Sequence, residues 1–191
     1  MANFSKVDNI NMKIQYEIHH STADSFTNSR MALKKLLNNK GLEVLDLKLD
    51  LALNNYRELP HYPQFYISLS HTKEIGAAVL VEKTYVCGIG IDIEWEQRTI
   101  KPGAEKFFIH LEDRHNLRPI ELWTAKEAAF KALSPLGTYP GTLVLSKIII
   151  QNNNFFTHEE PHLKGEFVVY HQTIGDKRYV FTIASIPLEL K

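Results

Sequence analysis

Three carboxylates and a lysine stand in two short segments whose spacing could support phosphoryl chemistry. Asp92 and Glu94 end the run Gly-Ile-Gly-Ile-Asp-Ile-Glu, and Glu127 and Lys131 belong to the run Trp-Thr-Ala-Lys-Glu-Ala-Ala-Phe-Lys, 123–131. Because side chains alternate along a strand, Asp92 and Glu94 share one face. On a helix, residues four apart are neighbours, so Glu127 and Lys131 form an acid and a base on one ridge. If strand and helix meet, the carboxylates offer oxygen ligands to a hard divalent cation beside an ammonium group.

Each of these residues also has an ordinary structural interpretation. Asp92 and Glu94 alternate with isoleucines as the solvent side of any half-buried strand does. Glu127 and Lys131 could be a surface pair that adds only ~0.3–0.5 kcal/mol to its helix. Lys126 is expected to be a solvated charge on the same helix. Taken alone, the pattern therefore leaves a metal site and two solvent-facing surfaces open.

Composition limits the class of protein. The chain has 191 residues, of which 44% are hydrophobic and 23% charged, and this fits a globular protein of one large or two small domains. Lys+Arg and Asp+Glu are equal at 22 each, so there is no basic excess to indicate non-specific binding to nucleic acid or membranes. The single cysteine, Cys87, excludes an intrachain disulfide and is typical of the cytoplasm. An apolar export or membrane-spanning segment is not indicated.

The first half of the chain predicts one helix followed by strands. Apolar spacing favours a helix over 21–39 that ends at Gly41, with Phe26, Leu33, Leu36 and Leu37 facing the core. Runs of β-branched and aromatic residues predict strands, and the last three should form an antiparallel meander; the runs are 42–49, 65–69, 75–81 and 85–94.

The second half predicts two helices and then strands. A Pro-Gly break at 102–103 precedes an expected helix over 104–115, and Pro119 suits the first turn of another helix that ends before Pro135. Strands are expected over 142–151, 165–172 and 178–186, with a turn at Gly175-Asp176.

This layout predicts an α+β fold of two similar lobes related by pseudo-twofold symmetry. Each lobe would be a helix packed on a small, mainly antiparallel sheet, with residues 1–97 in the first lobe and 98–191 in the second. The cleft between the lobes is the expected ligand site of one compact unit.

The two runs resemble the paired signature of the phosphopantetheinyl transferases, specifically the larger, surfactin-synthetase-activating type. The resemblance extends to Ile67-Ser-Leu-Ser-His71-Thr, which is similar to the family's Ser-His motif, and to Arg30 with Ala32-Leu33, which is similar to its N-terminal Arg-x-x-Leu helix. The segment 106–112 resembles the family's Phe-Phe-x-x-x-Glu segment. These motifs span roughly residues 25–135 in the expected order, so a chance match is far less probable than for one short motif.

The resemblance implies a magnesium-dependent transfer of the phosphopantetheine arm from coenzyme A to a serine hydroxyl of an apo acyl or peptidyl carrier protein. Adenosine 3′,5′-bisphosphate would be released, and the enzyme would act as a monomer. Asp92, Glu94 and Glu127 would hold Mg²⁺ against the pyrophosphate. Glu127 would accept the serine proton, directly or through water.

The resemblance also assigns cationic and hydroxyl side chains to coenzyme A. Lys131, Ser70 and His71 would stabilise charge on the phosphates. Arg30 would bind the phosphates of coenzyme A, because its planar fork suits anions. The family often carries Gly-Lys-Pro before the Ser-His strand, whereas this chain has Asn55-Tyr-Arg-Glu-Leu-Pro60. Arg57 is the residue that could replace that lysine.

Two other function classes remain open from the sequence. The same carboxylates could serve a metal-dependent phosphodiester hydrolase, or the chain could be a non-catalytic module that binds coenzyme A or a carrier protein. Other chemistries lack their motifs: Gly88-x-Gly90 has no third glycine opening a helix, and the histidines lack a His-Glu-x-x-His spacing.

Overall fold

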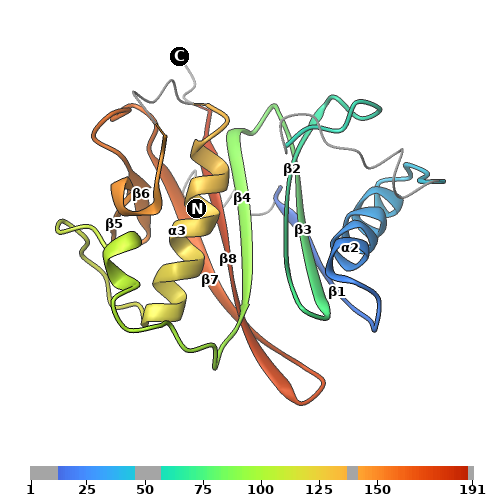
Figure 1. The fold of residues 1–191 in the computed structure, drawn as a ribbon. Helices are drawn as coiled ribbons and strands as arrows, with labels where there is room; N and C mark the ends of the chain where they lie inside the picture. Colours follow the sequence, from blue (N-terminus) through green and yellow to red (C-terminus); the bar gives the residue numbers. More distant parts are fainter. Residues whose placement is uncertain (1–12, 46–56, 137–141, 189–191) are drawn as a thin grey trace, which may run out of the picture.

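Two antiparallel sheets, each packed against one long helix, make up the fold (Figure 1). The structure is a computed structural model that describes residues 13–45, 57–136 and 142–188. The first sheet has the order β1-β3-β2 and the second β4-β8-β7-β6-β5. The strands are β1 (Gln15–His20), β2 (Phe65–Thr72), β3 (Ile75–Glu82), β4 (Val86–Trp95), β5 (Ile149–Gln151), β6 (Asn154–Phe156), β7 (Gly165–Ile174) and β8 (Lys177–Pro187), and the long helices are α2 (Ser25–Asn39) and α3 (Pro119–Leu133). The mixed helix and sheet composition agrees with the sequence.

Helix α2 starts later than its apolar pattern predicted. Asp24 caps it by accepting a hydrogen bond from the Thr27 amide at 2.9 Å, and the helix ends before Gly41, whose φ of 73° suits glycine. Phe26 was predicted to face the core but is 47% exposed, because it lies in the first turn under the Arg30 guanidinium, 4.0 Å from its ring centroid.

The predicted three-strand meander is confirmed for its first two strands, β2 and β3, which pair antiparallel, and is wrong for its last strand. β1, which was not predicted, pairs with β3, and β4 pairs with β8 from the C-terminal half. On its other edge β4 lies beside β2, where two serine hydroxyls replace backbone carbonyls as acceptors. Ser68 Oγ accepts from the Ile91 amide at 3.1 Å, and Ser70 Oγ accepts from the Ile93 amide at 3.3 Å. Side chains therefore satisfy buried amides where the two sheets meet.

Three apolar clusters hold the molecule together. One lies between α2 and the first sheet, another between α3 and the second sheet, and the third between the sheets. Ile91 and Ile93 belong to the third cluster, which confirms that the isoleucines of β4 point away from Asp92 and Glu94.

Several expected elements of the C-terminal half differ from the structure. The helix predicted over 104–115 is only a 3-10 turn, Glu105–Phe107, followed by irregular chain. Phe107, Ile109 and Leu111 recur every second residue, a spacing that does not form one helical face. The strand predicted over 142–151 is reduced to β5 after a 3-10 turn, Leu145–Lys147, and β6 was not predicted. Strands β7 and β8 and the turn at Gly175 are confirmed.

One predicted strand lies partly outside the described residues. Of the range 42–49, residues 42–45 form no strand, and the remainder is not described. Neither long helix of the described part has the length and apolar content needed to span a bilayer.

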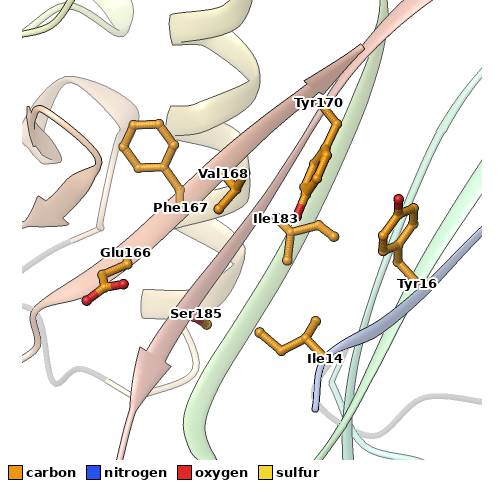
Figure 2. Close-up of a pocket in the computed structure, with 8 residues that line it drawn as sticks. All are labelled: Ile14, Tyr16, Glu166, Phe167, Val168, Tyr170, Ile183 and Ser185. Atoms are coloured by element: carbon orange, nitrogen blue, oxygen red, sulfur yellow. The ribbon is translucent and has the colours of Figure 1, made fainter. Parts of the chain in front are cut away.

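Aromatic side chains join β1 to the second sheet beyond the main cores. Tyr16 lies 5.6 Å from Tyr170 and 5.3 Å from Phe181 between ring centroids, and Tyr170 stacks on Phe181 at 4.9 Å. Beside them lies a hollow of about 60 Å³. Figure 2 shows Ile14 and Tyr16 on one side of it and residues of β7 and β8 on the other. The hollow is too small for a cofactor, so the contact is structural.

Candidate active site

Two glycines of β4 allow α3 to lie directly against the strand. A Cβ atom on Gly90 would stand 1.9 Å from the carbonyl oxygen of Ala128, and one on Gly88 would stand 2.5 Å from that of Ala132. Both distances are shorter than any real contact, so only glycine permits this approach. Asp92 shares the glycine face of β4 by alternation. The glycine run therefore brings the acidic end of β4 to the helix that carries Glu127.

Asp92 lies at the centre of a buried polar network. The residue is 6% exposed, and its Oδ1 accepts hydrogen bonds from Ser70 Oγ at 2.7 Å and from Lys131 Nζ at 2.8 Å. Lys131 Nζ also donates to the carbonyl oxygen of Ile91 at 2.9 Å. The other carboxylate oxygen, Oδ2, is buried and has no hydrogen-bond partner among the described residues. A buried acceptor of this kind is a strong position for a cation.

The charge of Asp92 influences the pKa values of Glu94 and Glu127. Burial raises the pKa of Glu94 to about 7; Arg98 opposes the shift, and the charges of Asp92 and Glu127 add to it. Burial also raises the pKa of Glu127, and Asp92 adds to that shift while Lys131 and Arg98 oppose it. Glu94 and Glu127 are therefore poorly solvated and lie within range of the charge of Asp92, which disfavours their ionised forms.

The donor chemistry of this region suits a hard divalent ion, although the side chains are turned to other partners. Glu94 is engaged with the Arg98 guanidinium, and Asp92 Oδ1 with Ser70 and Lys131. Across the described ranges, no three His, Cys, Asp or Glu side chains form a group that could hold a metal ion as they stand. The unpartnered Asp92 oxygen and the repulsion among three oxygen donors nevertheless fit Mg²⁺ by charge and ligand type.

A cavity of about 690 Å³ opens beside this network, between the two halves of the fold. Arg30 of α2, Arg57 and Lys131 of α3 line it with positive charge, and His71 of β2 lines it as well. Among the described residues, Arg30 Nε and Arg57 Nε and Nη1 are buried and find no hydrogen-bond partner. Unpaired buried guanidinium donors are costly, so an anionic ligand is the natural occupant.

A second cavity, of about 570 Å³, is also lined by His71. Glu94, Trp95 and Arg98 from the end of β4 and the chain after it form one wall, and Lys177 lies on the rim. His71 thus faces both cavities.

A third cavity, of about 370 Å³, connects Glu127 to an apolar surface. Phe107, Phe130 and Val144 line it together with Lys106. Outside it the chain exposes Ile109 and Leu111, the latter at 95%. Glu127 can therefore be reached from a surface that combines apolar and basic side chains.

The sequence misread one residue of this region and missed another. Lys126, expected to be solvated, is fully buried and bonded to Asp113. Arg98 was not singled out, although a cation four residues after Glu94 was the available signal. Glu112 of the family-like segment lies at the surface, 2.8 Å from His158, and lines none of these three cavities.

Comparison with known proteins gives one match. The family model described as 4'-phosphopantetheinyl transferase superfamily matches residues 88–184, just over half of the chain, and this range contains β4, α3 and the three carboxylates. No curated protein matches the sequence.

Proposed function

Because the chain belongs to the 4'-phosphopantetheinyl transferase superfamily, it is a transferase of phosphopantetheine to carrier proteins, and we propose that coenzyme A donates the 4'-phosphopantetheine arm. The acceptor is a serine hydroxyl of an apo acyl or peptidyl carrier protein, and the reaction uses Mg²⁺. Adenosine 3′,5′-bisphosphate is the released product. The observation that carries the proposal is the buried Asp92 network, with its unpartnered oxygen, at the edge of a cavity walled by unpaired arginine donors.

Asp92, Glu94 and Glu127 are the proposed ligands of Mg²⁺. When bound, the ion would neutralise the pyrophosphate of coenzyme A, so that an incoming hydroxyl is not repelled. The ion would also relieve the repulsion that, with burial, raises the pKa values of Glu94 and Glu127.

Glu127 is the proposed proton acceptor for the carrier serine. The serine oxygen forms a bond to the β-phosphorus, the bond from that phosphorus to the oxygen of the bisphosphate breaks, and the hydroxyl proton passes to Glu127, directly or through water. The place of Glu127 between the carboxylates and the third cavity supports access from the carrier side.

Lys131 and Ser70 have distinct proposed roles beside Asp92. Lys131 uses two of its donors on Asp92 and the Ile91 carbonyl, so a third proton is available to a phosphate oxygen. Ser70 accepts from Ile93 and donates to Asp92, so its hydroxyl first serves to orient that carboxylate.

Coenzyme A is proposed to occupy the 690 Å³ cavity. Arg30 and Arg57 would bind its phosphates with the guanidinium donors that lack partners among the described residues, and His71 would donate from the side nearer the pyrophosphate. The three cations of this wall, Arg30, Arg57 and Lys131, come from separate parts of the sequence, which supports a site formed by the fold rather than by one motif.

The carrier protein is proposed to dock on the apolar and basic surface around the third cavity. Phe107 lines the cavity and is exposed, Ile109 and Leu111 are exposed further along the same segment of the chain, and Lys106 adds positive charge. Carrier proteins of this kind are usually acidic helical bundles, so such a surface is complementary to them.

We further propose that the fold consists of two similar lobes. The lobes 1–97 and 98–191 would be related by pseudo-twofold symmetry, with the active site in their cleft; one support is that Gly76 of β3 meets the α2 backbone much as Gly90 of β4 meets α3. β4 would join the lobes by pairing with β8. We also propose the surfactin-synthetase-activating type and a cytoplasmic monomer, for which the sequence motifs and the single cysteine are the support.

Mass spectrometry of the carrier protein tests the reaction. The protein is incubated with coenzyme A, Mg²⁺ and an unmodified carrier, and the carrier should gain the mass of one phosphopantetheine while adenosine 3′,5′-bisphosphate accumulates. A matched reaction with the carrier serine replaced by alanine should show neither product. Cleaved coenzyme A with an unchanged carrier would instead identify a phosphodiester hydrolase. Bound but intact coenzyme A or carrier, over a panel of carriers, would identify a binding module.

A further inference from the structure

We propose that Arg98 acts as a built-in counter-ion, which pairs with Glu94 where a divalent ion would otherwise bind. The Arg98 side chain must leave Glu94 before the ion binds, so Arg98 sets the ion concentration that is needed to occupy the site. The proposal rests on the proposed function in taking Asp92, Glu94 and Glu127 as the ligands. Arg98 is a positioning residue in this scheme, since it acts through Glu94.

The ion pair between Arg98 and Glu94 competes directly with metal ligation. Arg98 Nη1 donates to Oε1 of Glu94, four residues earlier in the chain. The Glu94 side chain is only 13% exposed, whereas that of Arg98 is 48% exposed. The carboxylate is therefore fixed at the site, and its partner reaches it from the solvent side. A carboxylate oxygen held by a guanidinium is not available to a divalent ion at the same time.

Charges around the carboxylates come from two sides. Lys131 lies on the inner side, where it is anchored by Asp92 and the Ile91 carbonyl. Arg98 lies on the outer side, and its charge acts on both Glu94 and Glu127. Between them, Asp92 Oδ2 is buried and without a partner among the described residues. Arg98 therefore offsets the charge of Glu94 and Glu127, as a bound ion would, while one oxygen of Asp92 stays without a partner among the described residues.

Arg98 also has a place to move to. The cavity of about 570 Å³ is lined by both Glu94 and Arg98, so the guanidinium can turn away from the carboxylate without displacing the core. Its other contact is the face of Trp123, 5.5 Å from the ring centroid, which can support the side chain after it leaves Glu94. Lys131 has no equivalent freedom, because two hydrogen bonds hold its ammonium group in the network.

Binding of Mn²⁺ alone to the full chain tests the proposal, without substrate or turnover. Free and bound Mn²⁺ are separated by electron paramagnetic resonance for the wild type, Arg98→Gln, Arg98→Lys and Lys177→Gln. Removing the competing cation should tighten Mn²⁺ binding about tenfold in Arg98→Gln, the change expected when one modest ion pair no longer opposes binding. Arg98→Lys keeps the charge and should remain within about threefold of the wild type.

The Lys177→Gln variant is the matched control. Lys177 lines the same cavity and its side chain is 43% exposed, but the acid that it pairs with is Glu74, at 3.6 Å. Its loss should leave the Mn²⁺ affinity within about twofold of the wild type. An equal gain in Arg98→Gln and Lys177→Gln would show a general charge effect and overturn the proposal. Unchanged or weaker binding in Arg98→Gln, or no binding in any variant, would also overturn it.

The carrier assay on the wild type keeps this test separate from the proposed function. Arm transfer by the wild type together with unaltered Mn²⁺ affinity in Arg98→Gln would overturn the role of Arg98 alone. Tighter Mn²⁺ binding in Arg98→Gln without arm transfer would support the role of Arg98 and overturn the transferase proposal.

Discussion

The ammonium group of Lys126 lies 2.9 Å from both carboxylate oxygens of Asp113, and this ion pair is enclosed in the core. Lys126 also donates to the Ile148 carbonyl, and Asp113 accepts from the amides of His110 and Ile150. Burial lowers the pKa of Lys126, and the bond to Asp113 opposes that shift. The pair therefore fastens α3, one residue before Glu127, to the segment after Phe107 and to β5.

Breaking this pair should destabilise the protein strongly. Lys126→Met keeps the length of the side chain but leaves Asp113 buried and charged, so we expect a loss of about 3–5 kcal/mol in the free energy of unfolding. Urea denaturation measures the change. Lys147→Met is the control, because Lys147 pairs with Glu159 at 3.0 Å with 38% of its side chain exposed, and it should lose less than ~1 kcal/mol. Similar losses in both variants would contradict the role given to the buried pair.

Lys126 also shows where inference from the sequence stops. The acidic face of β4 followed from alternation, and the start of α3 followed from Pro119, because both signals lie within a few residues. Whether Lys126 is buried or exposed to solvent depends on Asp113 and Ile148, which the fold brings to it from elsewhere in the chain. No periodicity in the sequence reports such a partner.

The pairing of strands that are distant in the chain could not be predicted either, because it also leaves no local signal in the sequence. Short connections favoured β4 as the third strand of a meander, but its edge instead pairs with β8. Strand alternation, helix spacing and the resemblance of the two motifs to a known family predicted that the carboxylates would meet, and the glycines of β4 were recognised only as part of the motif. Their physical role, direct contact with Ala128 and Ala132 of α3, required the structure.

Ser68 should contribute to stability through the junction of β2 and β4. Its hydroxyl accepts from the buried Ile91 amide, and Ser68→Ala leaves that amide without an acceptor. We expect a loss of about 1–3 kcal/mol in the free energy of unfolding. Thr173→Ala, on an exposed part of β7, should change it by less than ~0.5 kcal/mol. A loss below that control value in Ser68→Ala would mean that water replaces the hydroxyl.

Asp92→Ala and Glu127→Ala should each abolish arm transfer while the protein stays folded. Each change deletes a proposed ligand of the ion, so the charge that develops on the phosphate in the transition state loses several kcal/mol of stabilisation. We therefore expect kcat/KM to fall by at least about a thousandfold. Carrier mass measured against time gives the rate, and circular dichroism checks the fold. Glu166→Ala removes a carboxylate beside the hollow of Figure 2 and should keep wild-type turnover. Near-normal turnover in either site variant would refute its assigned role.

Arg30 and Arg57 should determine the affinity for coenzyme A more than the rate at saturation. Arg30→Gln and Arg57→Gln each remove charged hydrogen-bond donors from the 690 Å³ cavity. Because the loss of one charged hydrogen bond costs ~1.5 kcal/mol, KM for coenzyme A should rise about tenfold, while kcat stays within about twofold of the wild type. Lys35→Gln, on the same helix but paired with Glu17 at 2.7 Å, should leave both constants unchanged. A fall in kcat with constant KM would place these arginines at the reacting phosphorus instead.

Glu94 should make the ion-free protein less stable as pH rises toward neutrality. Its folded pKa of about 7 lies above the ordinary value of 4.5, so between these values the folded protein binds more protons than the unfolded chain. The free energy of unfolding contributed by this group is therefore fully present below about pH 4.5 and is lost as pH passes 7. Urea denaturation from pH 5 to 8 in EDTA should show this decline, and Glu94→Gln should flatten it. Adding Mg²⁺ should weaken or reverse the wild-type decline, because deprotonated carboxylates bind the ion and only the folded state gathers them. The same slope in wild type and Glu94→Gln would show that other groups control the pH dependence.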